Sequence, residues 1–370
     1  MNELQKQVQQ AVGELVESGA ERGIQVAVYR HGEPVVDAVA GVADPETGRP
    51  VTSETVFYNF SIGKGATATV AHVLVERGVF GYDTRVVELW PEFGAHGKDG
   101  VTVRHVLTHS AGVPGVPPDT TPEDLCDWEK MCAAIADAEP WWEPGTEVGY
   151  HAYTFGYLVG EIVRRATGKP ISEVLREEVA GPLGVADELY FGVPVSEHGR
   201  LARLEDVEGA AQMMAEMPQD LPMFRAAPPS LYPTAELGNR PDILAADIPA
   251  GGKTSARAIA RMYSAVLGDL ADVRLISRDR LREATAVAAS GIDQVFGNPS
   301  SWALGYSLGV PGTTGAGDEH AFGMAGAGGS YAYGNPATGI AFALTKNRLT
   351  MDFTAVTEIS EIVSRAATNG

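Results

Sequence analysis

The sequence predicts an α/β protein whose sheet is built from both ends of the chain, with a mostly helical insertion between them. Strand-forming segments lie near the two ends, at residues 24–29, 34–39, 304–308, 330–333 and 339–344. From about residue 82 to 285 the chain is rich in Pro, Gly and helical patterns and has few convincing strands. Strands at both ends with helices between them indicate one domain formed by the two termini. We therefore expect an α/β domain from residues 1–81 plus 286–370 and a mostly helical domain from residues 82–285.

Local patterns support each element of this prediction. Apolar residues at helical spacing from Leu4 to Leu15 predict an amphipathic helix over about residues 3–18. His31-Gly32, between the two N-terminal strands, predicts a β-hairpin. Four further helices are predicted, at about residues 66–76 (ended by Gly78), 153–167 (ended by Gly168), 255–266 and 355–366. The segment from Pro218 to Pro241 is loop-like.

Composition excludes several classes of function. The 370 residues are 44% hydrophobic and carry a formal net charge of −20, so we expect no nucleic-acid or membrane partner. The polar N-terminal residues show no secretion signal, and no apolar run is long enough to span a bilayer, so we expect a cytoplasmic protein. Cys126 and Cys132 lie six positions apart and predict no disulfide. No metal-binding pattern is present, so we expect neither metal nor cofactor.

Ser61-Ile62-Gly63-Lys64 is the only S-x-x-K in the sequence. Residues three apart on a helix share a face, so the Lys64 amine can reach the Ser61 hydroxyl. A serine hydroxyl needs a base to become a good nucleophile, and a buried lysine of lowered pKa can serve. The Ser61 N–H, at a helix N-terminus, can also bind a developing oxyanion. The alternative for this tetrapeptide alone is an ordinary helix cap.

Five further blocks favour the catalytic interpretation, because in their order they resemble the serine β-lactamase and penicillin-binding-protein superfamily. The resemblance is closest to its class C-like esterase and transacylase branch. The blocks are Leu107-Thr108-His109-Ser110-Ala111-Gly112-Val113-Pro114, Pro144-Gly145-Thr146 with Tyr150-His151-Ala152, Gly181-Pro182-Leu183-Gly184-Val185, Pro249-Ala250-Gly251-Gly252 with Ser255-Ala256, and Phe322-Gly323-Met324-Ala325-Gly326-Ala327-Gly328-Gly329-Ser330. In the fourth block Ala258 replaces the closing Asp of the family pattern.

The resemblance implies a β-lactamase-like fold, with an antiparallel sheet flanked by the N- and C-terminal helices and the active site between the two domains. It also implies that Tyr150 is the third catalytic residue and moves the proton to the leaving group. The alternative for Tyr150 is an aromatic packing residue, the role that we expect for Tyr153 and Tyr157. Ala327 N–H is the implied second oxyanion donor, with Ser61 N–H as the first.

Two departures from the lactamase pattern concern the substrate. Tyr150-His151-Ala152 lacks the amide of Y-x-N, and Met324-Ala325-Gly326 stands where lactamases carry K-T-G. Met donates no proton and carries no charge, so the usual clamp for a substrate carboxylate is missing. We expect His151, Met324, Ala325, Gly326 and Gly328 to contact substrate.

Two residues that could be taken for catalytic groups, Lys253 and His109, are not expected to have a catalytic role. Lys253-Thr254 superficially resembles K-T-G, but it leads directly into a helix that Thr254 or Ser255 would cap, so it is not expected as the edge strand beside the nucleophile. His109 lies in a turn-like block, which favours a structural hydrogen-bonding role over that of general base.

The leading hypothesis is a carboxylesterase-type enzyme that cleaves a small-molecule acyl ester through an acyl-Ser61 intermediate. A transacylase that passes the acyl group to an alcohol or amine in natural-product biosynthesis is the close alternative. A β-lactamase or D,D-peptidase is disfavoured by the lost K-T-G. A non-catalytic binding protein is disfavoured because it would not need Ser61, Lys64 and Tyr150 together.

Overall fold

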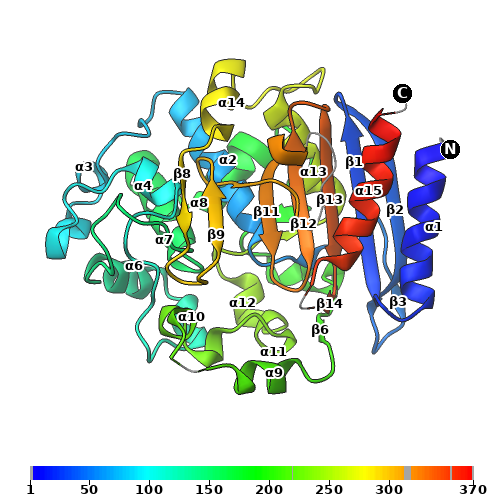
Figure 1. Ribbon diagram of the computed structural model, residues 1–370, viewed down its shortest axis with the longest axis horizontal. Coiled ribbons are helices and arrows are strands. Elements are labelled where there is room, and N and C mark those ends of the chain that lie inside the picture. Colours follow the sequence, from blue (N-terminus) through cyan, green and yellow to red (C-terminus); the bar gives the residue numbers. More distant parts are fainter. Residues whose placement is uncertain (1–2, 219, 312–317, 351, 369–370) are drawn as a thin grey trace.

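A nine-stranded antiparallel sheet forms the centre of the part of the chain described by the computed structural model, residues 3–218, 220–311, 318–350 and 352–368 (Figure 1). The strand order is β3-β2-β1-β13-β12-β11-β10-β9-β8. The bounds are β1 Gly23–Arg30, β2 Glu33–Asp44, β3 Arg49–Pro50, β8 Ala289–Ile292, β9 Pro299–Trp302, β10 Ser307–Leu308, β11 Phe322–Gly326, β12 Ser330–Asn335 and β13 Ile340–Lys346.

The two ends of the sequence meet in the middle of this sheet. β1 pairs antiparallel with β13, from Ile24 opposite Lys346 to Arg30 opposite Ile340. The predicted fold, a sheet built from both termini, is thereby confirmed. One predicted strand is shorter than expected, because Gly305 adopts a φ of +82° and leaves only Ser307–Leu308 extended.

Helices cover both faces of the sheet (Figure 1). α1 (Glu3–Glu17) and α15 (Thr354–Thr368) lie side by side on one face, where Val8 and Val12 pack in the same core cluster as Val356 and Ile359. α2 (Ile62–Glu76) and α13 (Ala256–Leu267) pack on the opposite face. The apolar spacing of α1 produces this arrangement because it places one stripe of the helix against the sheet.

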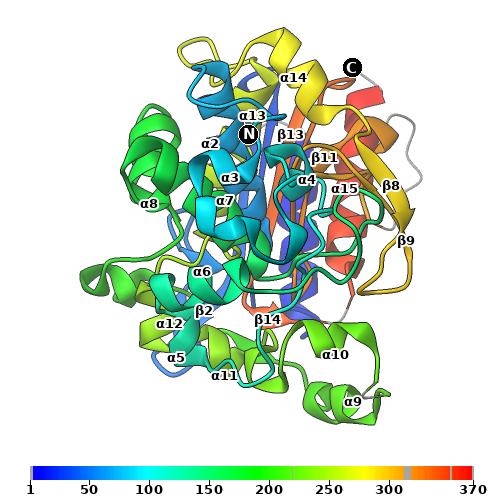
Figure 2. The ribbon, with the colours of Figure 1, turned by 90° about the vertical axis from the view of Figure 1, so that its left-hand side faces the viewer.

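Short helices and loops make up most of the region from residue 82 to 285 (Figure 2). The helices are α3 Val86–Leu89, α4 Val103–Leu107, α5 Pro122–Leu125, α6 Trp128–Ala136, α7 Thr154–Thr167, α8 Ile171–Leu175, α9 Ala210–Glu216, α10 Pro222–Ala226, α11 Ala235–Gly238, α12 Pro241–Ala245 and α14 Arg278–Thr285, with shorter turns at η1 Pro91–Gly97, η2 Arg176–Ala180, η3 Val195–Arg200 and η4 Pro229–Leu231. A further turn, η5, spans Asp318–His320. Two further short sheets form. In the first, β7 (Lys253–Thr254) lies between β4 (Phe57–Tyr58) and β5 (Leu189–Tyr190). In the second, β6 (Glu205–Asp206) pairs with β14 (Arg348–Leu349). Among the described helices, none has the length and apolarity needed to cross a membrane.

Helix α13 belongs with the sheet, although the sequence placed it in the helical region. It packs on β1, β12 and β13, and its buried Ile259 and Tyr263 lie in one core cluster with Ala27 and Ala343 of the sheet. The same cluster continues into α6 and α7. The core is therefore continuous across the expected boundary at residue 285.

Candidate active site

Ser61 lies at the start of α2, directly after a turn that is bonded to a distant segment of chain. Asn59 N–H donates to Gly252 O at 2.8 Å, and Gly252 N–H donates to Phe60 O at 2.8 Å. Phe60 has a left-handed φ of +46°, a strained conformation that persists only where the surroundings hold it. The Ser61 hydroxyl caps no backbone group of α2. The hydroxyl is therefore available for an interaction with the next turn of the helix.

Lys64 occupies that next turn. Its Nζ lies 2.9 Å from Ser61 Oγ and 3.0 Å from Ala250 O. The side chain is 1% exposed, and burial lowers the pKa of Lys64 to about 7. A neutral amine here can donate one N–H to Ala250 O and direct its lone pair at the Ser61 hydroxyl, which is what a general base requires.

Close backbone packing holds the Ala250 carbonyl between two helices. A Cβ on Gly63 of α2 would lie 2.1 Å from Gly252 N, and a Cβ on Gly156 of α7 would lie 2.2 Å from Ala250 N. Only glycine permits such an approach of two backbones. These two glycines therefore set the distance between the Lys64 amine and its backbone acceptor.

Tyr150 lies in the loop before α7 and reaches both residues. Its ring centroid is 5.0 Å from Lys64 Nζ, and its hydroxyl is hydrogen-bonded to Ser61. The ring stacks on Trp302 of β9, with centroids 5.8 Å apart. Burial raises the pKa of Tyr150, while the hydrogen bond with Ser61 acts in the opposite direction. The phenol is therefore protonated at neutral pH and can donate its proton.

Two histidines support the Tyr150 loop. His151 N–H donates to His109 Nδ1 at 3.0 Å, and the His109 ring lies 5.0 Å from the Tyr150 ring. Burial, helped by the charges of His151 and Lys64, holds the pKa of His109 well below its ordinary value. His109 is thus a neutral acceptor, in agreement with the structural role expected for it.

His151 departs from its expected role in substrate contact. The side chain is fully buried, its Nδ1 donates to Gly149 O at 2.6 Å, and its Nε2 accepts from Val113 N–H at 3.2 Å. Burial lowers the pKa of His151 to about 4, against the effect of the Gly149 hydrogen bond. Because the backbone occupies both ring nitrogens, His151 fixes the loop that carries Tyr150 and offers nothing to a substrate.

Strand β11 brings the segment that replaces K-T-G alongside α2. β10 pairs only with the first two residues of β11, so within the described chain the edge from Met324 to Gly326 is open on that side. The Met324 side chain is buried against Val148 and Trp302, and Ala325 packs on the opposite face of the sheet. These two side chains are therefore less available to a substrate than expected. The backbone edge is the accessible part of the strand.

The turn after β11 lies beside Ser61. A Cβ on Gly326 would lie 2.2 Å from Asn59 O, so the end of the strand touches the turn that precedes the serine. Ala327 is the first residue of the turn into β12, and Gly328 follows with a φ of +89°. Among the described residues, neither Ser61 N–H nor Ala327 N–H finds a hydrogen-bond acceptor. Two backbone donors without acceptors are the kind of groups that an oxyanion hole uses.

Lys253 differs from expectation in its local structure. Lys253–Thr254 forms the short strand β7, which pairs with β4 immediately before Ser61. Ser255 caps α13 through Ala258 N–H, as the sequence predicted. The Lys253 amine is buried over the Tyr58 ring and donates to Phe191 O. It therefore stabilises the turn that carries the nucleophile, and β11 supplies the strand edge.

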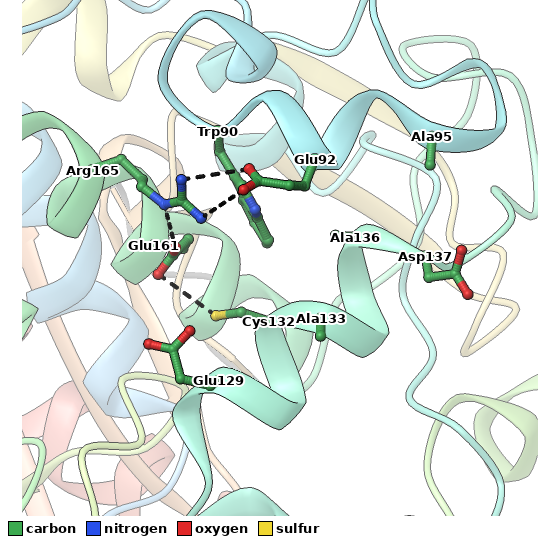
Figure 3. A pocket seen from close by; sticks show the side chains of 10 residues that line it. All are labelled: Trp90, Glu92, Ala95, Glu129, Cys132, Ala133, Ala136, Asp137, Glu161 and Arg165. Carbon is green, nitrogen blue, oxygen red and sulfur yellow. Dashed lines mark hydrogen bonds and ion pairs between the residues drawn. The ribbon is translucent and has the colours of Figure 1, made fainter.

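A separate cavity of about 380 Å³ lies between η1, α6 and α7 (Figure 3). Its lining is acidic and includes none of Ser61, Lys64 and Tyr150. Arg165 bridges Glu92 and the buried Glu161, as Figure 3 shows. The other two lining carboxylates also have partners, Glu129 with Arg164 and Asp137 with His96. Each lining carboxylate therefore has a hydrogen-bond or ion-pair partner within the protein.

Three residues near the reactive groups were not predicted from the sequence to lie at the site. Trp302 and Phe296 flank the Tyr150 ring, and Asp293 folds the intervening loop by accepting Phe296 N–H at 2.9 Å. Asp293 and Phe296 lie in the loop between β8 and β9, and Trp302 lies in β9. This segment is rich in Ser, Gly and Pro and gives a weak strand signal.

The packing of α2 against β11, where a sheet meets a helical region, is the architecture of the β-lactamase-like serine enzymes. The chain belongs to the beta-lactamase family, whose model matches residues 8–365.

Known proteins similar to this chain include several esterases. It is 37% identical over 339 residues to Esterase/beta-lactamase LipL of Mycobacterium tuberculosis, a match that covers 88% of this chain and 77% of LipL. A crystal structure of a family VIII carboxylesterase superposes with a TM-score of 0.89 at 32% identity and covers 98% of each chain. EstA from Arthrobacter nitroguajacolicus Rue61a has a TM-score of 0.88 at 27% identity, covering 100% of this chain and 98% of EstA.

Proposed function

We propose that Ser61 is the nucleophile of a carboxylesterase reaction, with Lys64 as its general base and Tyr150 as the proton donor to the leaving group. The observation that carries this assignment is the 2.9 Å contact between Ser61 Oγ and the Lys64 amine, whose pKa is about 7. The similar proteins named esterase and carboxylesterase support the reaction class. The protein is a serine ester hydrolase of the carboxylesterase type.

In the acylation step, Lys64 accepts the Ser61 proton as the serine oxygen attacks the ester carbonyl carbon. The carbonyl oxygen becomes an oxyanion and accepts hydrogen bonds from Ser61 N–H and Ala327 N–H. Each such donor contributes about 10²–10³-fold to the rate. When the ester C–O bond breaks, the Tyr150 phenol protonates the departing alkoxide and regains a proton from the Lys64 ammonium.

In the deacylation step, an acceptor attacks the acyl-Ser61 carbonyl carbon and loses its proton to Lys64. The bond between the acyl carbon and Ser61 Oγ then breaks, and Ser61 Oγ regains a proton from the Lys64 ammonium. Water as the acceptor gives hydrolysis, and we propose it as the main acceptor. An alcohol or amine in the same position gives acyl transfer by the same residues. Trp302 and Phe296 lie beside Tyr150 and present aromatic surface there. Because aromatic side chains are largely apolar, this surface modestly favours an alcohol or amine with an apolar body over water as the acceptor.

The charge around the site favours neutral esters. Met324 supplies no cation, His109 is neutral, and the Asp293 carboxylate adds negative charge near Tyr150. A substrate carboxylate would lose hydration here without gaining a paired charge. We therefore propose short neutral acyl esters as the substrate class.

Intact-protein mass spectrometry after incubation with short-chain activated esters tests the assignment. The wild type should gain one acyl group on Ser61, and the adduct should decay in buffer. Ser61→Ala should gain none and lose ester turnover, while Ser53→Ala, a serine outside the site, should behave as the wild type. Turnover retained in Ser61→Ala would refute the nucleophile. Faster decay of the adduct on addition of an amine, with a matching amide product, would identify acyl transfer.

A further inference from the structure

A chain of buried and half-buried polar groups contacts the β11–β12 turn. Glu21 follows α1, and Lys346 ends β13; they form an ion pair in which the side chains are 4% and 2% exposed. Lys346 Nζ also donates to Thr350 Oγ1 at 2.8 Å. Thr350 N–H donates to Gly328 O at 3.2 Å. The chain of contacts thus runs from the N-terminal region to the turn that carries Ala327.

The turn is packed against these groups without free space. A Cβ on Gly328 would lie 2.4 Å from Leu349 Cδ2, and a Cβ on Gly329 would lie 2.5 Å from Asp352 O and 3.0 Å from Lys346 Cε. Both glycines have a φ of +89°. On its other side the same turn touches Asn59 through Gly326. A displacement of Lys346, Leu349 or Thr350 would therefore reach the turn beside Ser61.

Stability alone does not explain a buried ion pair here. Burying two charges costs several kcal/mol of hydration, and well-packed apolar residues often do as well. A buried ion pair does fix the relative position of its two side chains, because each charge is stabilised only when its partner is close. Here the ion pair fixes the Lys346 amine, which fixes the position of Thr350 through its hydroxyl. Thr350 N–H in turn fixes the orientation of the Gly328 carbonyl.

We propose that Glu21, Lys346 and Thr350 are positioning residues that orient the Ala327 N–H toward the oxyanion formed at Ser61. Only one peptide, between Ala327 and Gly328, separates the peptide that bears the Ala327 N–H from the peptide that bears the Gly328 carbonyl. Holding the Gly328 carbonyl at Thr350 N–H therefore restricts the turn that carries the Ala327 N–H. The inference rests on the proposed esterase function and on Ala327 as the second oxyanion donor. None of the three residues touches the reacting atoms.

Thr350→Val tests this role, since it keeps the shape of the side chain and removes the hydroxyl that Lys346 bonds. We expect kcat for a short-chain ester to fall about tenfold or more, short of the 10²–10³-fold lost with a whole donor, and KM to stay unchanged. The affinity for an alkyl boronic acid, whose tetrahedral Ser61 adduct mimics the oxyanion, should fall by the same factor. Thr350→Ser should restore both values.

Thr345→Val is the matched control, because it removes a buried hydroxyl from the same strand end that bonds Gln25 and not the turn. It should lower thermal stability and leave kcat and boronate affinity unchanged. Equal kcat and boronate affinity in Thr350→Val and Thr345→Val would overturn the positioning role. A wild type that forms no Ser61 adduct and cleaves no ester would instead refute the proposed function itself.

Discussion

The backbones of Gly63 and Gly252 are in direct contact. A Cβ atom added to Gly63 would lie only 2.1 Å from Gly252 N. The contact fixes the turn that carries Ala250 O against the helix that carries Lys64. The distance between the Lys64 amine and its carbonyl acceptor, Ala250 O, depends on this contact.

Gly63→Ala should therefore damage catalysis more than its size suggests. The new methyl group must push the 250–252 segment away from α2, and a misplacement of about 1 Å costs about 10²-fold in rate. We expect kcat/KM for a short-chain ester to fall by that order, together with the melting temperature. Gly13→Ala in α1 is the control: nothing lies within 4 Å of its Cβ, so it should gain about 0.5–1 kcal/mol and keep full activity. Wild-type activity in Gly63→Ala would contradict the argument.

The pH dependence of acylation should report Lys64. Below its pKa of about 7 the amine is protonated and cannot accept the Ser61 proton, so kcat/KM should fall about tenfold per pH unit toward acid. Above pH 7 it should reach a plateau, which ends only where Tyr150 ionises, above its ordinary value. Lys64→Arg, which stays charged, should lose the plateau altogether. An unchanged acid limb in Lys64→Arg would assign that limb to another group.

Tyr150→Phe separates proton transfer from packing. The ring contacts with Trp302 and His109 remain, so stability should hardly change, whereas kcat should fall about 10²-fold or more. Tyr157→Phe should show the reverse, because it removes a 2.6 Å hydrogen bond to the buried Leu125 carbonyl. It should lose about 1 kcal/mol of stability and retain kcat. Kinetic and thermal measurements on both variants distinguish the two roles, and an unfolded Tyr150→Phe would make Tyr150 a packing residue.

Cephalosporins should be poor substrates compared with neutral esters. Their carboxylate would approach the Met324 edge, where no cation compensates for lost hydration, at a cost of several kcal/mol. The comparison is informative because LipL carries both activities in its name. The measurement is kcat/KM for a chromogenic cephalosporin and a short-chain ester on one preparation. Similar values would mean that another cation serves the carboxylate.

The elements that the sequence predicted well are those with strong local signals. Helix α7 ends at Gly168, which adopts a left-handed φ of +73°, and α13 begins at Ser255, whose hydroxyl caps it. The Ser61–Lys64 pair was predictable because three residues along a helix is a fixed distance. In each case neighbours in sequence determine the outcome.

The remainder depends on contacts between distant segments. Ala250 contacts Lys64 through its backbone carbonyl, which every residue possesses. The residue type at position 250 therefore does not indicate this contact. His151 resembles a substrate ligand in the motif, yet its surroundings come from Gly149 and Val113, which fold around it. α13 was assigned to the helical region because sequence order alone does not reveal that it covers β1 and β13.

The pairing of β1 with β13 also has a consequence for biosynthesis. During vectorial synthesis on a ribosome, Ile24 emerges long before its partner Lys346. Until then β1 has only the hairpin with β2, and a single hairpin is marginally stable in water. The sheet beneath α2 therefore closes late, and the nascent chain carries an apolar strand edge for most of its translation. Any chaperone that assists this protein should recognise β1 during that interval.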